Sequence, residues 1–266
     1  MSERDKILRY YRAAGDAEIA ARLLDLSETA LKTRKYKVSE FLDPYGLSIA
    51  ETIAAHYERL ALETSGGYLG AERVKVAFVD ADFLEFADPD SFEFNLEAIL
   101  IKWDSRYYRL SHRDILGALM GLGIKREILG DIIMAGEQCY VIADASMGNY
   151  IVQHLVEVGQ ATVSVSNVAL DEIPAKEEKV KEIRATVASL RLDAVAAAGF
   201  GTSRTRMAED IGAAKLKVNW QEAKSPSQVV KVGDVISMRG RGRVEIVEVP
   251  GQTKKGRYSI LLKRFM

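Results

Sequence analysis

The sequence predicts an α+β protein of three parts, and three observations point to this class. The first 73 residues carry helix-like apolar spacing, residues 74–170 alternate between strand-like and helix-like segments, and the rest of the chain is basic. The chain has 266 residues, of which 48% are hydrophobic and 28% are charged. That length and composition are ordinary for a globular protein of two or three domains.

Residues 1–73 are predicted to form a helical N-terminal region. Ala17–Leu31 is rich in strong helix formers. The helical pattern stops at Asp43–Gly46, where a proline follows an aspartate, and then resumes. Ser65–Gly70 is predicted to be a turn, because it lacks the lysine of a phosphate-binding loop.

Residues 74–170 are predicted to form a ferredoxin-like domain. After a first strand at Val74–Val79, the segments follow the order β-α-β-β-α-β, which RNA-recognition domains share. The expected helices are Ser111–Leu122 and Met147–Val158, and the expected strands are Phe92–Trp103, Asp131–Ala135, Gln138–Ala143 and Ala161–Val168. The aromatic-rich strand motif of RNA-recognition domains is missing, since Asn95–Ile101 is acidic and aliphatic. RNA binding by this sheet therefore has no support in the sequence.

Charge is divided unevenly along the chain. From Arg184 to the end there are 16 Lys and Arg against 7 Asp and Glu, a balance of +9. The whole chain carries −1, so residues 1–183 carry −10. A basic module on an acidic body is typical of proteins that bind a polyanion. We place a charged, proline-containing linker at 171–183 and an RNA-binding domain at 184–266.

The stretch from Ser189 to Trp220 is predicted to form two short helices followed by a strand. Ser189 is a candidate N-cap of the first helix, and Gly199 is its candidate left-handed stop. The second helix is expected to begin at the cap pair Thr202–Ser203. Its apolar arc comprises Met207, Ala208, Ile211 and Ala214. Leu216–Trp220 is expected to continue as a strand with one apolar face.

The start of the second helix combines free backbone amides with arginines, and both groups attract phosphate. The candidate RNA-contacting residues of the helices and strand are Arg191, Ser203, Arg204, Arg206, Lys215, Lys217 and Asn219. An alternative stays open, in which Arg204 merely pairs with Asp193 or Asp210 on a solvated surface.

A second, outer set of candidate RNA-contacting residues follows in the chain. It comprises Arg239, Arg241, Arg243, Lys254 and Lys255. The three arginines share one face if their segment is extended. The two lysines are expected on the connection of a final hairpin, after a turn at Pro250–Gly251.

No catalytic or metal-binding constellation is evident in the sequence. His56, His112 and His154 are far apart, and Cys139 is predicted to be a buried small hydrophobe. We therefore expect no enzymatic activity, no cofactor and no metal. No apolar run approaches 18 residues and the N-terminus lacks the features of a signal peptide, so we expect no membrane span and a cytoplasmic location.

The order and spacing of several short motifs resemble the S-four RNA-binding domain, which is named after a protein of the small ribosomal subunit. The motifs are Arg191-Leu192-Asp193, Ser203-Arg204, Leu216-Lys217-Val218-Asn219 and Val232-Gly233-Asp234-Val235-Ile236, preceded by Pro226. Two positions depart from the usual pattern. Ala214 stands where glycine is common, and Trp220 replaces the glycine after the asparagine, which puts an aromatic ring where RNA or protein could stack.

A more specific resemblance, to the YlmH family, covers nearly the whole chain. It is carried by Phe41–Pro44, His112–Ile132, Ser189–Asp193, Val218–Trp220, Arg239–Arg243 and Gly251–Arg257. In that family Trp220 is expected. The resemblance implies a non-enzymatic factor that binds the large ribosomal subunit. Its S-four domain would contact ribosomal RNA and tRNA during rescue of obstructed subunits that still hold peptidyl-tRNA. No DNA partner is implied.

Two other functions stay open at this point. The first is a protein-interaction scaffold for cell division or photosystem assembly, in which the basic C-terminal part has an accessory role. The second is an enzyme that acts on RNA through an unrecognised site in residues 74–170.

Overall fold

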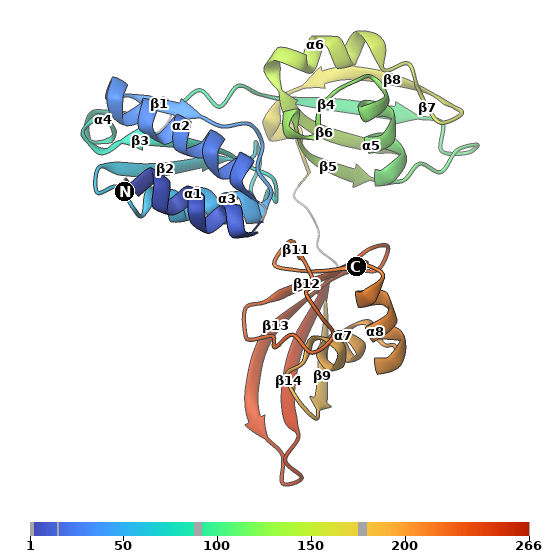
Figure 1. Cartoon of the computed structure of the whole chain (residues 1–266). Helices are drawn as coiled ribbons and strands as arrows, with labels where there is room; N and C mark the ends of the chain where they lie inside the picture. Colours follow the sequence, from blue (N-terminus) through green and yellow to red (C-terminus); the bar gives the residue numbers. More distant parts are fainter. Residues whose placement is uncertain (1–2, 15, 88–91, 175–179, 266) are drawn as a thin grey trace. The chain divides into compact units, whose positions relative to one another are not determined.

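The computed structural model describes residues 3–14, 16–87, 92–174 and 180–265. The chain divides into two compact units, Met1–Lys176 and Glu177–Met266 (Figure 1). Each unit combines helices with antiparallel sheet, which confirms the predicted mixed class.

The first part of the N-terminal unit is a small sheet covered by helices. Its helices are α1 (Glu3–Ala14), α2 (Ala17–Thr33), α3 (Pro44–Ala54) and α4 (Ala81–Phe86). Its strands are β1 (Tyr36–Val38), β2 (Leu60–Ser65) and β3 (Lys75–Asp80), in the order β1-β3-β2. The helix predicted around residues 17–31 is confirmed. Strands β1 and β2 lie in the region predicted to be helical, so the sequence did not predict them, and β1 has only three residues.

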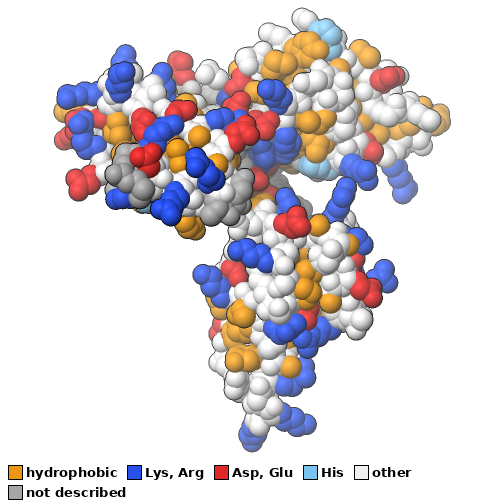
Figure 2. All heavy atoms as spheres, in the orientation of Figure 1, with side chains coloured by type: hydrophobic (Ala, Val, Ile, Leu, Met, Phe, Trp, Pro, Cys, Tyr) orange, Lys and Arg blue, Asp and Glu red, His pale blue; other side chains and the backbone are white. Residues whose placement is uncertain are grey.

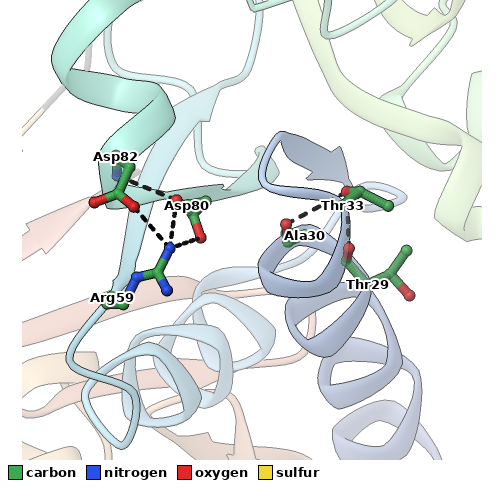
Figure 3. A network of polar contacts seen from close by, with 6 residues as sticks. All are labelled: Thr29, Ala30, Thr33, Arg59, Asp80 and Asp82. Carbon is green, nitrogen blue, oxygen red and sulfur yellow. Dashed lines mark hydrogen bonds and ion pairs between the residues drawn. The ribbon is translucent and has the colours of Figure 1, made fainter.

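Strand β3 is the strand expected at residues 74–79, but it belongs to a different sheet from the one predicted for the central domain. It pairs with β1 and β2, and all its residues are buried. Asp80 ends the strand and caps α4 by accepting the N–H of Asp82. The guanidinium of Arg59 lies between the carboxylates of Asp80 and Asp82, at 2.9 and 2.8 Å (Figure 3). The buried charge of Asp80 is thereby paired.

The second part of the N-terminal unit is the predicted ferredoxin-like domain. Its elements are β4 (Leu96–Trp103), α5 (His112–Gly121), β5 (Leu129–Ala135), β6 (Gln138–Asp144), α6 (Ala145–His154), β7 (Glu157–Val158) and β8 (Ala161–Val168). The sheet order is β5-β6-β4-β8-β7. Ser111 and Asp114 form a capping box at the start of α5, so the predicted cap is confirmed. Ile115 and Leu119 of α5 and Ile151 of α6 pack on one face of the sheet.

The opposite face of this sheet is covered by residues from outside it. Ala98, Leu100 and Ile142 of the sheet belong to a buried cluster with Phe41 and Ile173. Tyr68 and Leu170 pack against the same cluster. The first part of the unit therefore lies on the face that RNA-recognition domains leave open for bases.

Polar contacts reinforce this cover. Lys75 is buried, donates from Nζ to the carbonyl of Phe94 at 2.9 Å, and pairs with Asp144 at the start of α6. Arg73 Nε donates to the carbonyl of Leu129 at 2.9 Å, and Arg126 Nη1 donates to the same oxygen at 2.7 Å. Buried cations bound in this way fix how the two parts of the unit meet.

The C-terminal unit is a six-stranded antiparallel sheet with two helices. Its elements are β9 (Val180–Val187), α7 (Leu192–Phe200), α8 (Arg204–Gly212), β10 (Leu216–Val218), β11 (Gln221–Glu222), β12 (Val235–Met238), β13 (Gly242–Gln252) and β14 (Tyr258–Phe265). The sheet order is β11-β10-β12-β13-β14-β9. Leu192, Val195 and Phe200 of α7 and Met207 of α8 share its core with Leu262.

Strand β9 begins inside the segment predicted to be a linker, 171–183. Its residues Val180–Val187 pair with β14 along their whole length. At the other end of that segment, Ile173 is buried against the central sheet. Residues 175–179 lie outside the described residues. The many charged residues on the exposed face of β9 made its alternation of apolar and polar residues hard to recognise in the sequence.

Both predicted ends of α7 are wrong. Its N-cap is Arg191 and not Ser189. The helix continues through Gly199 and ends at Gly201, which has the left-handed φ of 63°. Gly199 is needed for close packing, because a Cβ there would lie 2.8 Å from Cγ1 of Val244. The predicted cap of α8, Ser203, is confirmed by its hydroxyl, which accepts the N–H of Arg206.

The segment after α8 contains three non-glycine residues with positive φ. They are Ala214 (55°), Asn219 (48°) and Trp220 (64°). Asn219 and Trp220 form the two-residue turn between β10 and β11, so the predicted strand stops at Val218 and Trp220 is not on its apolar face. Ala214 is therefore strained at the position where glycine is common in S-four domains.

Replacing Ala214 by glycine tests this strain. The left-handed backbone costs a residue with a Cβ about 1–2 kcal/mol, and the freedom of glycine in the unfolded chain takes back about 0.4–1 kcal/mol. We expect Ala214→Gly to stabilise the C-terminal unit by roughly 0.5 kcal/mol. The measurement is urea unfolding followed by Trp220 fluorescence in a Trp103→Phe background.

The matched control is Ala213→Gly, at the neighbouring exposed alanine, which has a φ of −87°. With no strain to relieve, it should destabilise the unit by roughly 0.5–1 kcal/mol. Equal effects of the two substitutions would contradict the assignment of strain to Ala214.

Candidate nucleic-acid interface

The carboxylate of Asp193 joins the starts of α7 and α8. Its side chain is only 7% exposed and accepts hydrogen bonds from Arg191 Nη2 at 3.0 Å and Arg204 Nη2 at 3.1 Å. Burial alone would raise the pKa of Asp193, but the hydrogen bonds and charges of the two arginines hold it below its ordinary value. We call this group, Asp193 with Arg191 and Arg204, the arginine clamp.

The sequence left open whether Arg204 contacts RNA or merely pairs with Asp193 or Asp210, and the geometry of the clamp answers this in part. Arg204 does pair with Asp193, as the alternative held, and it makes no ion pair with Asp210 among the described residues. The side chains of Arg191 and Arg204 nevertheless stay 38% and 50% exposed. Arg204 uses a single nitrogen for Asp193, so its guanidinium can still donate outward.

The N-terminus of α8 adds backbone donors beside the clamp. Ser203 accepts the N–H of Arg206 at 3.2 Å, which leaves the amides of Arg204 and Thr205 without an intrahelical partner. These amides and the positive end of the helix dipole favour an anion at this point. Ser203 itself is exposed.

A basic hollow of about 780 Å³ lies on the other side of α8. Four cationic side chains line it: Arg206, Lys215, Arg239 and Arg241. Asp210 also lines it and pairs with Lys215 at 2.7 Å. That hydrogen bond, with the charges of Arg206 and Arg241, holds the pKa of Asp210 below its ordinary value. Cations outnumber carboxylates in the lining, so the hollow suits phosphate groups.

The three arginines of the outer set do not share a face, contrary to the expectation of an extended segment. The chain reverses between β12 and β13, with Gly240 and Gly242 at φ of 76° and 82°. Arg241 Nη2 donates to the carbonyl of Phe200 at 2.9 Å, and Arg243 lies over the ring of Phe265 at 4.6 Å. The reversal needs glycine, because a Cβ on Gly242 would lie 2.5 Å from a backbone oxygen.

Lys217 and Asn219 differ in how the structure uses them. Lys217 is exposed in the middle of β10. The Asn219 side chain donates to Asp234 at 2.9 Å and accepts the N–H of Val235 at 2.9 Å. The geometry gives Asn219 a structural part in closing the turn, and Lys217 remains a candidate for RNA contact.

Lys254 and Lys255 are exposed at the end of the β13–β14 hairpin. Strand β13 runs on to Gln252, so the turn lies at Thr253–Gly256 and not at Pro250–Gly251. Figure 1 shows this hairpin projecting beyond the helices, and Figure 2 shows Lys and Arg side chains along the C-terminal unit and at its tip. The two lysines form a small positively charged patch that is separate from the clamp and from the basic hollow.

Asp193 and Asp210 were not among the predicted site residues, although both order cations there. The signal for Asp193 was present in the motif Arg191-Leu192-Asp193, which places a carboxylate two residues after a cation. In the sequence, this carboxylate was interpreted only as an ion-pair partner that would keep Arg204 from binding RNA.

Metal binding and nucleophilic chemistry have little support in the described part of the chain. It holds no group of three or more His, Cys, Asp or Glu side chains placed to bind a metal ion. Cys139 is buried, and burial raises the pKa of its thiol to about 12, so it is a poor nucleophile. Among the described helices, none is long and apolar enough to cross a membrane.

Three family models match the chain. They are described as "YlmH, N-terminal" (residues 15–83), "Putative RNA-binding domain in YlmH" (residues 89–172) and "S4 domain" (residues 190–236). Together they follow the order of the parts described above.

Two known proteins resemble the chain. One is the "Ribosome-associated protein quality control protein P2" of Bacillus subtilis (strain 168), which is 33% identical over 232 residues, 86% of this chain and 88% of that protein. The other is the solved structure of the "Cell division protein ylmH from Streptococcus pneumoniae". It has a TM-score of 0.50 and 20% identity over 60% of this chain and 95% of that one, so it supports the fold alone. By its matching models and the Bacillus relative, the chain belongs to the YlmH family.

Proposed function

We propose that this protein is a non-catalytic factor that docks on RNA of the large ribosomal subunit through residues 184–266. It would act in the rescue of obstructed large subunits, close to their peptidyl-tRNA, in the cytoplasm. The observation that carries the proposal is the arginine clamp, in which a buried carboxylate holds two half-exposed guanidinium groups at a helix N-terminus. The name of the Bacillus relative and the S4 domain match support it.

The clamp and the basic hollow flank the same short helix. Arg204 lies at its start, beside free amides and joined to Arg191 through Asp193, whereas Arg206 and Lys215 line the hollow. Phosphates of one RNA backbone could therefore be bound along α8. The wide, shallow groove of an RNA helix is recognised by shape and by its sugars and phosphates, which fits a surface made of cations and amides.

The charge of the rest of the chain disfavours non-specific binding of RNA over the whole protein surface. Residues 1–183 carry a net charge of −10, against +9 for the remainder. Like charges repel, so an RNA would bind the C-terminal unit and be repelled by most of the acidic body.

Removing two arginines at α8 tests the site. Arg204→Ala with Arg206→Ala should weaken binding to purified large subunits and to ribosomal RNA about 10- to 100-fold, the equivalent of roughly 1.4–2.8 kcal/mol. The slope of log affinity against log salt should become less steep by roughly 0.7–0.9 for each phosphate that the protein no longer neutralises. Sedimentation with large subunits and filter binding over a salt series measure both effects.

The control is Lys224→Ala with Lys231→Ala, which removes the same charge from exposed positions outside the candidate set. If both double variants lose affinity equally, the binding is diffuse and the site at α8 is wrong.

A substitution in the clamp separates positioning from net charge. Asp193→Asn adds one positive charge, which by itself favours RNA, but it removes the ion pairs that orient Arg191 and Arg204. We expect affinity for large subunits to fall about 3- to 10-fold, or roughly 0.7–1.4 kcal/mol. Far-UV circular dichroism and urea unfolding check that the unit stays folded.

Glu222→Gln, at an exposed position in β11, adds the same charge without touching the clamp. It should bind as well as the unaltered protein or slightly better. An Asp193→Asn protein that matches it in affinity would rule out a positioning role for Asp193.

A further inference from the structure

The central domain cannot use its sheet as RNA-recognition domains do. Phe41 and Ile173 are buried on that face with the sheet residues, and Tyr68 and Leu170 pack against them. The family model that matches residues 89–172 is nevertheless described as "Putative RNA-binding domain in YlmH". A role in RNA binding therefore needs another surface of this domain.

The segment between β4 and α5 has the composition that such a surface requires. Residues 102–113 contain four Lys and Arg against one Asp, and three aromatic residues. This excess of positive charge stands within a part of the chain that carries −10 overall. We call residues 102–113 the aromatic-basic segment.

Two of the three aromatic rings of this segment, those of Tyr107 and Tyr108, are exposed. Tyr107 is 76% exposed and Tyr108 is 37% exposed. The side chain of Arg106 is 79% exposed, and Arg109 and Arg113 are exposed as well. The ring of Tyr107 in particular buries little apolar surface, so packing alone does not explain an aromatic residue at that position.

The exposed rings are held on an ordered turn. Asp104 accepts hydrogen bonds from the backbone N–H of Arg106 at 3.1 Å and from its guanidinium at 2.7 Å, and its carbonyl accepts the N–H of Tyr107 and of Tyr108. The guanidinium of Arg106 lies 5.6 Å from the centre of the Tyr107 ring. The one carboxylate of the segment is thus used internally, and the rings are positioned before any partner arrives.

An open hollow of about 690 Å³ adjoins the turn. Trp103 lines it with the cations Lys102 and Arg106, the carboxylates of Asp104 and Glu137, and the hydroxyls of Ser105 and Ser164. Trp103 is half-buried at the end of β4. Two cations are matched by two carboxylates here, so the hollow offers stacking and hydrogen bonds, while the net positive charge comes from Arg109 and Arg113 in the rest of the segment.

We propose that the aromatic-basic segment binds single-stranded RNA, with unpaired bases stacked on its tyrosines and the backbone along its arginines. Aromatic rings among cations are the recurring means of holding unpaired bases, and a double helix hides the faces that such rings need. The excess of cations and the hydroxyl-lined hollow favour RNA over a protein partner, whose interface would be centred on apolar side chains. The inference extends the proposed function to a second surface, on a different unit from the arginine clamp.

The two tryptophans of the chain allow each surface to be observed separately. Trp103 lies in the aromatic-basic segment and Trp220 lies in the C-terminal unit beside β10. In a full-length Trp220→Phe protein, Trp103 is the single reporter. Titration with an oligouridylate of about ten nucleotides, long enough for one single-strand site, should quench Trp103 fluorescence saturably.

Removing the rings tests whether they carry the binding. Tyr107→Ser with Tyr108→Ser, in the Trp220→Phe protein, should raise the Kd for the oligouridylate about fivefold or more for each ring, as expected from roughly 1 kcal/mol or more per stacked base. Tyr10→Ser is the matched control, because Tyr10 is 70% exposed on α1 and outside the segment. It should leave the Kd unchanged.

Crosslinking on the unaltered chain provides a second measurement that does not depend on a variant. RNA containing 4-thiouridine should crosslink to the peptide that holds Tyr107 and Tyr108, as identified by mass spectrometry. The inference is overturned by unquenched Trp103, by quenching that the tyrosine substitutions leave intact, by a lack of crosslinks in the segment, or by capture of a protein there that RNA does not displace.

Failure here is distinguishable from failure of the proposed function. A Trp103→Phe protein, in which Trp220 reports, should still bind ribosomal RNA through the C-terminal unit if only the second surface is wrong. Loss of binding there, with quenching of Trp103 retained, would instead overturn the proposed function and keep this inference.

Discussion

A carboxylate that is only 7% exposed needs cations around it, and in the C-terminal unit the side chain of Asp193 obtains them from two segments. Arg191 comes from the residue before α7 and Arg204 from the first turn of α8. Removing one of these partners leaves the charge of Asp193 with less compensation. The ion pairs with Asp193 therefore hold the two arginines in place in the folded protein, and the exposed parts of their guanidinium groups can still bind a phosphate. The proposed recognition of RNA would depend on the same three side chains as the local fold.

A related constraint shapes the N-terminal unit. Arg73 and Arg126 lie side by side and donate mainly to backbone carbonyls. Burial and the neighbouring charge of Arg73 together lower the pKa of Arg126 to about 10, although the charges of Asp131, Asp43 and Glu127 oppose both effects. Even so, Arg126 stays protonated at neutral pH. Two desolvated cations at this junction are tolerable only with many acceptors, so the first part of the unit is a fixed cover for the central sheet.

That cover explains why a domain with the strand order of RNA-recognition domains lacks their aromatic strand motif. The central strand β4 places Ala98 and Leu100 towards Phe41 and Ile173, where aliphatic side chains pack well. Exposed rings would have no room there. Tyr140 of β6 is buried under the cover, whereas Trp103, Tyr107 and Tyr108 lie at the end of β4 and just after it, outside the covered cluster.

The sequence predicted what depends on local chemistry. Ser203 caps α8, Ser111 and Asp114 form the capping box of α5, and the strands of the central sheet lie close to their predicted positions. The sequence-based prediction was wrong where the conformation of a residue depends on a contact with a residue far away in the chain. Gly199 looks like a helix stop, but its missing Cβ makes room for Val244 from β13. Trp220 looks like the last residue of a strand, but the pairing of Val218 with Gln221 forces it into a left-handed turn.

The candidate site shows the same division. Spacing predicted Arg191, Ser203, Arg204 and Arg206 as candidates, and all four lie at helix starts, although the local signals placed only the start of α8 correctly. Spacing could not predict the hydrogen bonds of the Asn219 side chain to Asp234 and Val235, or the hydrogen bond from Arg241 to the carbonyl of Phe200. Each of these bonds joins elements that are far apart in the sequence. The two basic surfaces consequently differ in kind. In the C-terminal unit, folded neighbours fix the guanidinium groups, which suits the regular phosphates of structured RNA. In the aromatic-basic segment a single local turn presents rings to solvent, which suits bases that no helix has already stacked.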